Sequence, residues 1–302
     1  MKKLVSSVLA ASMVLSLAAC GSSASTDTAS SSEAASASTA ATAEAAGEGS
    51  GAYTGTPIKI GGIGPVTGGA AIYGQAVKNA EELAVKEINA ANGSDVFEWK
   101  FEDDEHDAEK SVNAYNSLKD WGMQMLVGPT TTGASMSVAD ACYNDRTFML
   151  TPSASSTDVT AGKDNVFQVC FTDPNQGISS ADYIFEHMPE SKLAVIYRND
   201  DAYSQGIRDT FVQEAADKGM EVVYQGTFTN DTASDFTVQL TGAQKAGADL
   251  VFMPIYYQPA SIILAQAKAM GYAPTFFGVD GMDGILTLSL IHISEPTRLA
   301  LI

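Results

Sequence analysis

Hydrophobic and polar positions alternate with two different periods along most of the chain. Short runs rich in β-branched and aromatic residues are followed by longer segments in which apolar residues recur every three or four positions. The first pattern predicts buried strands and the second predicts amphipathic helices. The predicted strands are 58–63, 98–102, 125–127, 147–150, 166–170, 193–197, 221–227, 250–254 and 275–278. The predicted helices are 73–91, 107–120, 135–144, 177–187, 205–218, 237–246 and 260–270.

Regular alternation of strands and helices predicts an α/β fold with parallel sheets. The run Leu250 to Met253 is apolar throughout, as expected for a strand that is covered on both faces. About 230 residues follow position 56, which suits two lobes of ordinary domain size. We therefore predict two doubly wound parallel-sheet lobes, 57–172 and 173–287, joined by a hinge at Thr172 to Pro174.

The first 56 residues have a different character. Lys2 and Lys3 precede an apolar run that ends in small residues at Cys20, which is typical of a secretory signal of the bacterial lipoprotein type. We predict a signal peptide over 1–20 and a lipid on Cys20, the alternative being a plain secreted protein with a chance cysteine. Residues 21–56 are rich in Ala, Ser and Thr and predict a disordered stalk.

The last fifteen residues depart from the pattern. Leu288 to Arg298 reads LSLIHISEPTR, which is the translation of a common sequencing-library adapter. We expect the native sequence to stop near Thr287 and residues 288–302 to be a non-native tail, although a native segment with this sequence is the alternative.

Charge and cysteine content exclude several classes of protein. The formal net charge is −19, from 36 acidic and 17 basic residues, and no basic cluster lies outside the predicted signal peptide. Nucleic acid is therefore excluded as a partner. Beyond Cys20 only Cys142 and Cys170 remain, and we expect both to be buried free thiols.

Motifs of catalysis and of metal binding are missing. The sequence has no G-x-S-x-G, H-E-x-x-H, Walker A or C-x-x-C motif. The acidic stretch 102–107 lacks the spacing of a calcium loop and predicts a solvated turn. Gly62 to Gly64 only weakly suggests a dinucleotide turn, because the next glycine is Gly68. The sequence predicts no enzyme, no metal and no cofactor.

Small hydroxyl residues follow three predicted strands, over 64–69, 128–135 and 151–157. Open α/β sheets bind ligands at the carboxyl ends of their strands, and the second of these loops leads into a helix. Unpaired N–H groups at a helix N-terminus suit a carboxylate. The loops therefore predict a small anion site, although ordinary helix caps explain any single loop equally well.

The order of these elements resembles the branched-chain amino-acid receptors, the leucine/isoleucine/valine-binding class of the type I periplasmic-binding-protein family. The resemblance covers residues 57 to about 287. It is carried by 58–61 with 64–68, Tyr73-Gly74, 84–89, 127–129, 151–154, 171–173, 201–206, Tyr256-Tyr257 and 278–281.

The resemblance implies a role for eight residues. Thr132, Ser153, Ala154 and Ser155 would hold the α-carboxylate of an amino acid, and Asp280 would hold its α-ammonium. Tyr73, Tyr203 and Tyr256 would wall the side-chain pocket, with Phe171 or Tyr257 beside them. Core packing of each aromatic residue, and a solvated turn at Asp280, are the alternatives.

The resemblance also implies a function. The expected protein captures a neutral, branched-chain amino acid at the outer face of the cell membrane, anchored through Cys20, and delivers it to an ABC permease. The threonine run at 130–132 departs from the usual family loop and leaves the ligand open to amides or short peptides. A sensing ectodomain of the same fold is the second alternative, and a hydrolase or an adhesin is less favoured. In the family the chain crosses back to complete the first lobe after the region of Asp280, and we expect that segment to be missing here.

Overall fold

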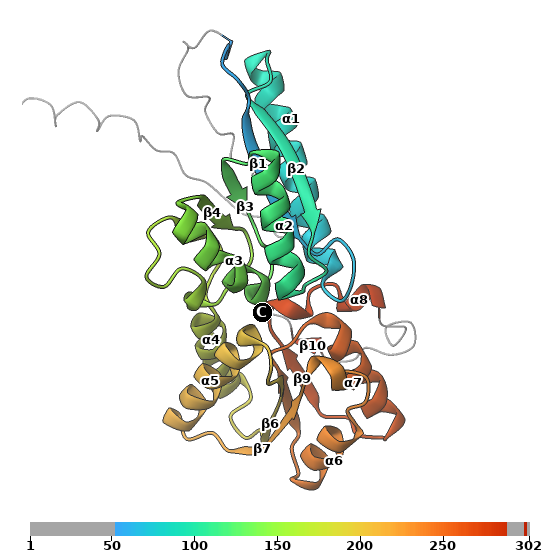
Figure 1. Cartoon of the computed structure of the whole chain (residues 1–302). Helices are drawn as coiled ribbons and strands as arrows, with labels where there is room; N and C mark the ends of the chain where they lie inside the picture. Colours follow the sequence, from blue (N-terminus) through green and yellow to red (C-terminus); the bar gives the residue numbers. More distant parts are fainter. Residues whose placement is uncertain (1–51, 289–298, 301–302) are drawn as a thin grey trace, which may run out of the picture. The chain divides into compact units, whose positions relative to one another are not determined.

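The structure is a computed structural model that describes residues 52–288 together with Leu299 and Ala300 (Figure 1). Residues 50–302 form one compact unit. The predicted signal peptide, Cys20, nearly all of the predicted stalk and most of the predicted tail lie outside the described residues.

The first sheet is parallel and has the strand order β2-β1-β3-β4-β5. Figure 1 draws it and its helices in blue to green. Its elements are β1 (Ile58–Gly64), α1 (Ala71–Asn92), β2 (Phe97–Asp103), α2 (Ala108–Trp121), β3 (Met125–Val127), α3 (Thr132–Asp145), β4 (Phe148–Thr151), the short helix η1 (Thr157–Val159) and β5 (Val166–Gln168).

The second sheet is also parallel and has the order β10-β9-β8-β6-β7. It occupies the yellow-to-red part of Figure 1. Its elements are α4 (Asp173–His187), β6 (Leu193–Arg198), α5 (Ala202–Asp217), β7 (Val222–Phe228), η2 (Asn230–Thr232), α6 (Thr237–Lys245), β8 (Leu250–Met253), α7 (Tyr257–Ala269), β9 (Thr275–Gly278), η3 (Asp280–Met282), α8 (Ile285–Leu288) and β10 (Leu299–Ala300).

The predicted α/β class with two parallel sheets is confirmed by this topology. Every residue of β8 is buried, as its apolar run predicts, and the second sheet carries a hydrophobic cluster on each face. Phe252 stacks on Phe211 with ring centroids 3.9 Å apart. Full burial of one such side chain stabilises the fold by about 1.5–3 kcal/mol. The chain passes from the first sheet to the second between Gln168 and Asp173, beside the predicted hinge; the lobe bounds themselves stay a prediction.

Four helices begin three or four residues earlier than predicted: α3, α4, α5 and α7. Their first turns contain polar residues or proline, such as Pro174 near the start of α4. Such residues are tolerated there because the first N–H groups of a helix have no partner within the helix. As a consequence, Thr132 and Asp173 are the first residues of their helices, and Tyr256 is the N-cap residue of α7.

Two expectations about burial are wrong in part. Cys142 is buried, but Cys170 is only partly buried, because it follows β5 at the edge of the sheet. Asp104 is fully buried rather than solvated, since it accepts hydrogen bonds from the His106 N–H at 3.0 Å and from the Ser111 hydroxyl at 3.1 Å. Burial raises the pKa of Asp104 to about 6.

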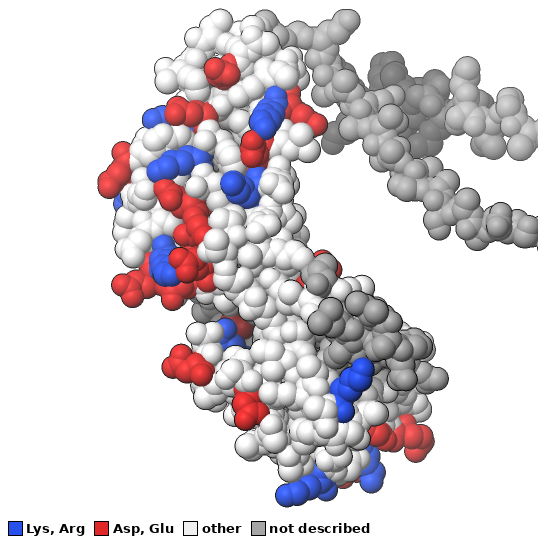
Figure 2. All heavy atoms as spheres, turned by 90° about the vertical axis from the view of Figure 1, so that its right-hand side faces the viewer, with Lys and Arg blue, Asp and Glu red and all other residues white. Residues whose placement is uncertain are grey.

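Charged side chains of both signs lie close together on the surface. On the face shown in Figure 2 they gather along one side of the upper part and near the lower end, with a largely uncharged band between. Exposed pairs such as Arg146 with Asp164, at 2.7 Å, are screened by solvent and add little to stability. Within the described residues, no helix has the length and apolar character needed to cross a bilayer.

Candidate functional site

The carboxyl ends of β3 and β4 meet in a network of hydroxyl groups. Ser135 and Thr151 both donate to the Pro129 carbonyl, at 2.8 and 2.7 Å, and the Thr151 hydroxyl accepts from the Ala154 N–H at 3.0 Å. The Thr132 hydroxyl accepts from the Ser155 N–H at 3.3 Å. These bonds fix the two loops against each other and hold Thr132 and Ser155, each 1% exposed, side by side.

Asp280 lies at the carboxyl end of β9, at the start of η3. The Tyr203 hydroxyl donates a short hydrogen bond to its Oδ1 atom, and the same hydroxyl accepts from the Gly281 N–H at 2.9 Å. A side chain at position 281 would collide with Tyr203, because its Cβ would lie 2.6 Å from the Tyr203 oxygen. The pair of Tyr203 and Asp280 therefore depends on a glycine at this position.

Tyr73 joins the two sheets. It belongs to α1, beside the first sheet, and its hydroxyl lies 2.8 Å from the Gly281 carbonyl and 3.0 Å from the Asp283 carbonyl, both beside the second sheet. The Tyr73 ring packs edge-on against Tyr256 with centroids 6.0 Å apart, and Tyr256 stacks on Tyr203 at 4.9 Å. The three predicted tyrosines thus form one aromatic cluster.

These residues surround one small cavity, which we call the inner cavity. Its volume is about 10 Å³, and its lining is Tyr73, Thr130, Thr131, Thr132, Ser153, Ser155, Tyr203, Tyr256, Asp280 and Gly281. Seven of the eight residues selected from the sequence are among them. Ala154 lies just behind, in the same loop. A cavity of this size holds about one water molecule, so an amino acid can enter only if the tyrosine contacts rearrange.

Burial sets the electrostatics of the inner cavity. It raises the pKa of Asp280, and the Tyr203 hydrogen bond opposes that shift. The pKa values of Tyr73, Tyr203 and Tyr256 are also raised, first by burial and then by nearby carboxylates. The tyrosines therefore stay protonated at neutral pH and act as neutral donors, and Asp280 is the residue of the lining that can carry a negative charge.

Sequence reasoning missed two buried acids near this cavity. Asp173 is 1% exposed, neither of its carboxylate oxygens has a hydrogen-bond partner in the described structure, and burial raises its pKa to about 7. Asp201 is 6% exposed, and burial raises its pKa as well. Both stand at helix N-termini, where an acid is ordinary, so no sequence pattern indicates their burial.

Metal-ligating side chains do not come together in the described part of the chain. No group of three or more His, Cys, Asp or Glu side chains there could hold a metal ion.

Phe171 is 54% exposed and lies outside the inner cavity, whereas Tyr257 packs against Tyr73 at 5.8 Å. Of the two additional aromatic candidates, only Tyr257 contacts the aromatic cluster.

The fold and the inner cavity together indicate the class of protein. Two parallel α/β sheets present the carboxyl ends of their strands to a common cavity with hydroxyl groups on one side and a carboxylate on the other, which is the architecture of a protein that encloses a small ligand. A family model described as periplasmic binding protein matches residues 57–290. The chain belongs to that family, whose members are substrate-binding proteins of transporters rather than enzymes.

Individual relatives agree with this assignment. A Leu/Ile/Val-binding protein homolog 3 from Brucella melitensis biotype 1 is 34% identical over 231 residues, which covers 75% of this chain and 62% of that protein. The leucine-, isoleucine-, valine-, threonine-, and alanine-binding protein of Pseudomonas aeruginosa is 28% identical and covers 74% and 61%.

A solved structure gives the same result. The branched-chain amino acid transporter substrate binding protein LivJ from Streptococcus pneumoniae, in complex with isoleucine, superposes with a TM-score of 0.68. It is 30% identical, and the match covers 75% of this chain and 65% of that one. The chain therefore spans less than two thirds of the length of each of these three proteins.

Proposed function

We propose that the protein captures a small amino compound, in the first instance a neutral amino acid of the branched-chain type, outside the cell and delivers it to an ABC permease. The observation that supports this most directly is the inner cavity, where a hydroxyl-lined helix N-terminus faces a buried carboxylate. Relatives that are named for leucine, isoleucine and valine point to the same ligand class. In this role the protein is a carrier and catalyses no reaction.

The two ends of an amino acid match the two sides of the cavity. The α-carboxylate would bind Thr132 and the Ser153 to Ser155 loop, where the N-terminus of α3 favours an anion. The α-ammonium would bind Asp280 in place of the Tyr203 hydroxyl. Charge-assisted bonds of this kind are worth about 1.5–3 kcal/mol each.

Uptake would proceed by closure of two lobes, 57–172 and 173–287, about the Thr172 to Pro174 segment. In the open form the Tyr73 bonds to the carbonyls of Gly281 and Asp283 would be broken, because they join the two sides of the cavity. Ligand binding would replace these contacts and enclose the amino acid between the tyrosines.

We also propose that the protein is a lipoprotein with its lipid on Cys20. The support is the sequence Leu17-Ala18-Ala19-Cys20-Gly21 after an apolar run. Metabolic labelling with a radioactive fatty acid tests this: label should enter the wild-type chain and not Cys20→Ser. Equal labelling of both would exclude this site.

A thermal-shift screen of the purified full chain against the twenty amino acids tests the main proposal. A ligand at 100 times its Kd should stabilise the protein by about 2.7 kcal/mol. We expect a shift with a few neutral amino acids that is absent in Asp280→Ala. If no amino acid shifts the melting temperature, the capture of amino acids is refuted, and a short-peptide ligand, a sensor of another ligand or an adhesin becomes the better hypothesis.

A further inference from the structure

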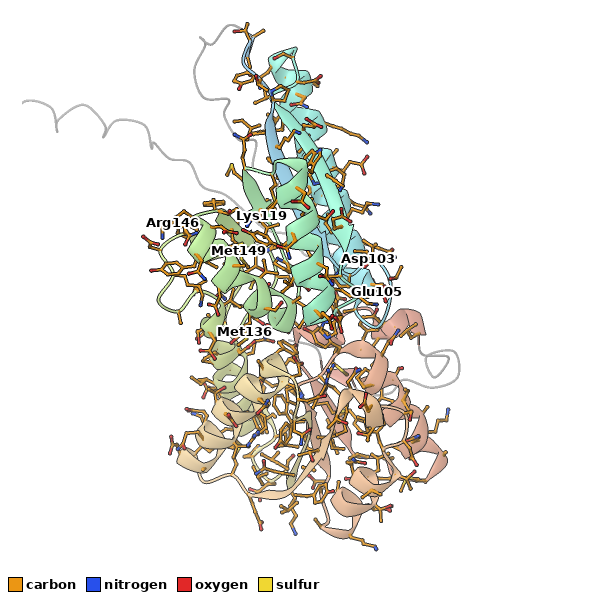
Figure 3. All side chains as sticks on the ribbon, viewed as in Figure 1. Asp103, Glu105, Lys119, Met136, Arg146 and Met149 are labelled. Atoms are coloured by element: carbon orange, nitrogen blue, oxygen red, sulfur yellow. The ribbon has the colours of Figure 1, made fainter. Side chains whose placement is uncertain are left out.

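A second cavity of about 630 Å³, which we call the outer cavity, lies beside the inner one. The two share Tyr256 in their linings, and the His106 ring packs edge-on against Tyr256 with centroids 5.0 Å apart. Glu105 and Met136, two further lining residues, lie in Figure 3 at the side of the blue-to-green region nearest the yellow-to-red region. The outer cavity falls within the range of about 300–1,000 Å³ that is usual for small-molecule sites.

Arg198 is the last residue of β6 and lines the outer cavity. Only part of the hydrogen-bonding capacity of its guanidinium is used within the described residues. Its Nε–H donates to Asp200 at 2.7 Å, and its terminal nitrogens make no hydrogen bond within the described residues. The side chain is 20% exposed. Burial and the charge of Arg198 together lower the pKa of His106 to about 4, so that the ring beside the guanidinium is neutral at pH 7. A guanidinium with free terminal donors suits a carboxylate.

The start of α3 adds donors on the opposite wall. Gly133 and Ala134 line the outer cavity, and the N-cap residue Thr131 makes no capping bond with its side chain. No heavy atom lies within 4 Å of the point where a Cβ of Gly133 would stand, so its backbone borders open space. This positive end of a helix also favours an anion.

A carboxylate acceptor completes the set. Asp201 lines the outer cavity and is 6% exposed, and its Oδ2 atom has no hydrogen-bond partner in the described structure. A buried acceptor without a partner is unfavourable, which a ligand N–H group would relieve. The outer cavity therefore offers donors to a carboxylate and an acceptor to an N–H group, which are the two polar groups at the second residue of a dipeptide.

We propose that the two cavities together bind a short peptide. This inference rests on the function proposed above, because the N-terminal ammonium would bind Asp280 in the inner cavity. The Tyr256 ring would turn aside to join the cavities, the peptide N–H would reach Asp201, and the C-terminal carboxylate would bind Arg198. A free branched-chain amino acid fills the inner part alone and leaves Arg198 without a partner.

Calorimetric titration of the purified full chain with leucine, leucyl-leucine and leucyl-leucinamide, and with the alanine series in parallel, tests the proposal. We expect the dipeptide to bind at least about 10-fold more tightly than the free amino acid and than the amide, which lacks the carboxylate. Arg198→Gln should weaken the binding of the dipeptide at least about 10-fold, or about 1.4 kcal/mol. The affinities for leucine and for the amide should stay within about twofold of the wild-type values. Asp200→Asn is the matched control, because it breaks the same ion pair and keeps the guanidinium.

The outcomes separate this inference from the function on which it rests. If leucine binds and depends on Asp280, but the dipeptide binds no better or Arg198→Gln weakens all three ligands alike, the peptide proposal is wrong and amino-acid capture stands. If none of the ligands binds, both are wrong.

Discussion

The two sides of the inner cavity differ in the polar groups that they present. The first sheet contributes neutral hydroxyl groups that already bond one another, such as Thr132 with Ser155 at 3.3 Å. The second sheet and its helices contribute Tyr203, Tyr256 and the Asp280 carboxylate, whose pKa is raised by burial. One side is a preformed set of hydroxyl groups with little charge, and the other holds a buried carboxylate whose charged form is favoured by hydrogen bonds with Tyr203, Gln176 and the Gly281 backbone. Such a pair of surfaces would distinguish the two ends of the zwitterion that we propose as the ligand.

Replacing Asp280 should have the largest effect on amino-acid affinity, because it removes the charge from one side of the inner cavity. Asp280→Asn keeps the shape and an acceptor for Tyr203 but removes the charge that an ammonium requires. We expect amino-acid affinity to fall at least about 100-fold, or about 2.7 kcal/mol, in calorimetric titration. Asp283→Asn, an exposed acid in the same turn, is the control and should bind as wild type does. Comparable affinities for Asp280→Asn and the control would remove the ammonium site from the second sheet.

pH should act in opposite directions on the stability of the protein and on ligand binding. The folded-state pKa of Asp173 is about 7, above the value of about 3.9 expected when unfolded, so its contribution to stability is fully present below pH 4 and is lost as pH rises through 7. The raised pKa of Asp280 acts in the same direction on stability, whereas the binding of an ammonium requires the ionised form.

We therefore expect opposite trends in stability and in affinity as pH rises. The ligand-free protein should lose stability between about pH 4 and 7, with a slope of up to about 1.4 kcal/mol per pH unit from Asp173, and ligand affinity should rise as Asp280 ionises. Urea unfolding with and without ligand measures both, and Asp173→Asn should flatten the first trend. Parallel trends would mean that the buried acids do not control either property.

Removing one hydroxyl on the first sheet should have a smaller effect. Thr132→Val keeps the volume, deletes a ligand donor and leaves the Ser155 N–H without its acceptor. We expect about a 10-fold loss of affinity, with a loss of stability of about 1–3 kcal/mol from the unsatisfied group. Ser137→Ala, on the same helix and outside the inner cavity, should not alter binding. Binding by Thr132→Val that matches wild type would restrict the carboxylate site to the backbone.

The same asymmetry explains how much the sequence could predict. Hydroxyl loops at strand ends can be recognised from local pattern, and the family resemblance then selects Thr132, Ser153 and Ser155, which all line the inner cavity. The burial of Asp173 and Asp201 could not be predicted, because it depends on how neighbouring helices pack, such as α4 against α5, where Asp173 lies against Gly206. The early starts of α3 and α7 were missed because polar and proline residues in a first helical turn resemble a loop.

The smallest effect is expected at Tyr256, which touches both cavities. Its ring packs on Tyr203, Tyr73 and His106, but its hydroxyl makes no hydrogen bond within the described residues. Tyr256→Phe should therefore change amino-acid affinity by less than about twofold. Tyr203→Phe, which removes the bonds to Asp280 and Gly281, should raise affinity about 10-fold, because the ammonium no longer has to displace the Tyr203 hydroxyl from Asp280. Calorimetric titration of these two variants measures the part of the affinity that depends on each hydroxyl, because both variants keep the ring. A large change in affinity for Tyr256→Phe would show that its hydroxyl contacts the ligand once the cavity opens.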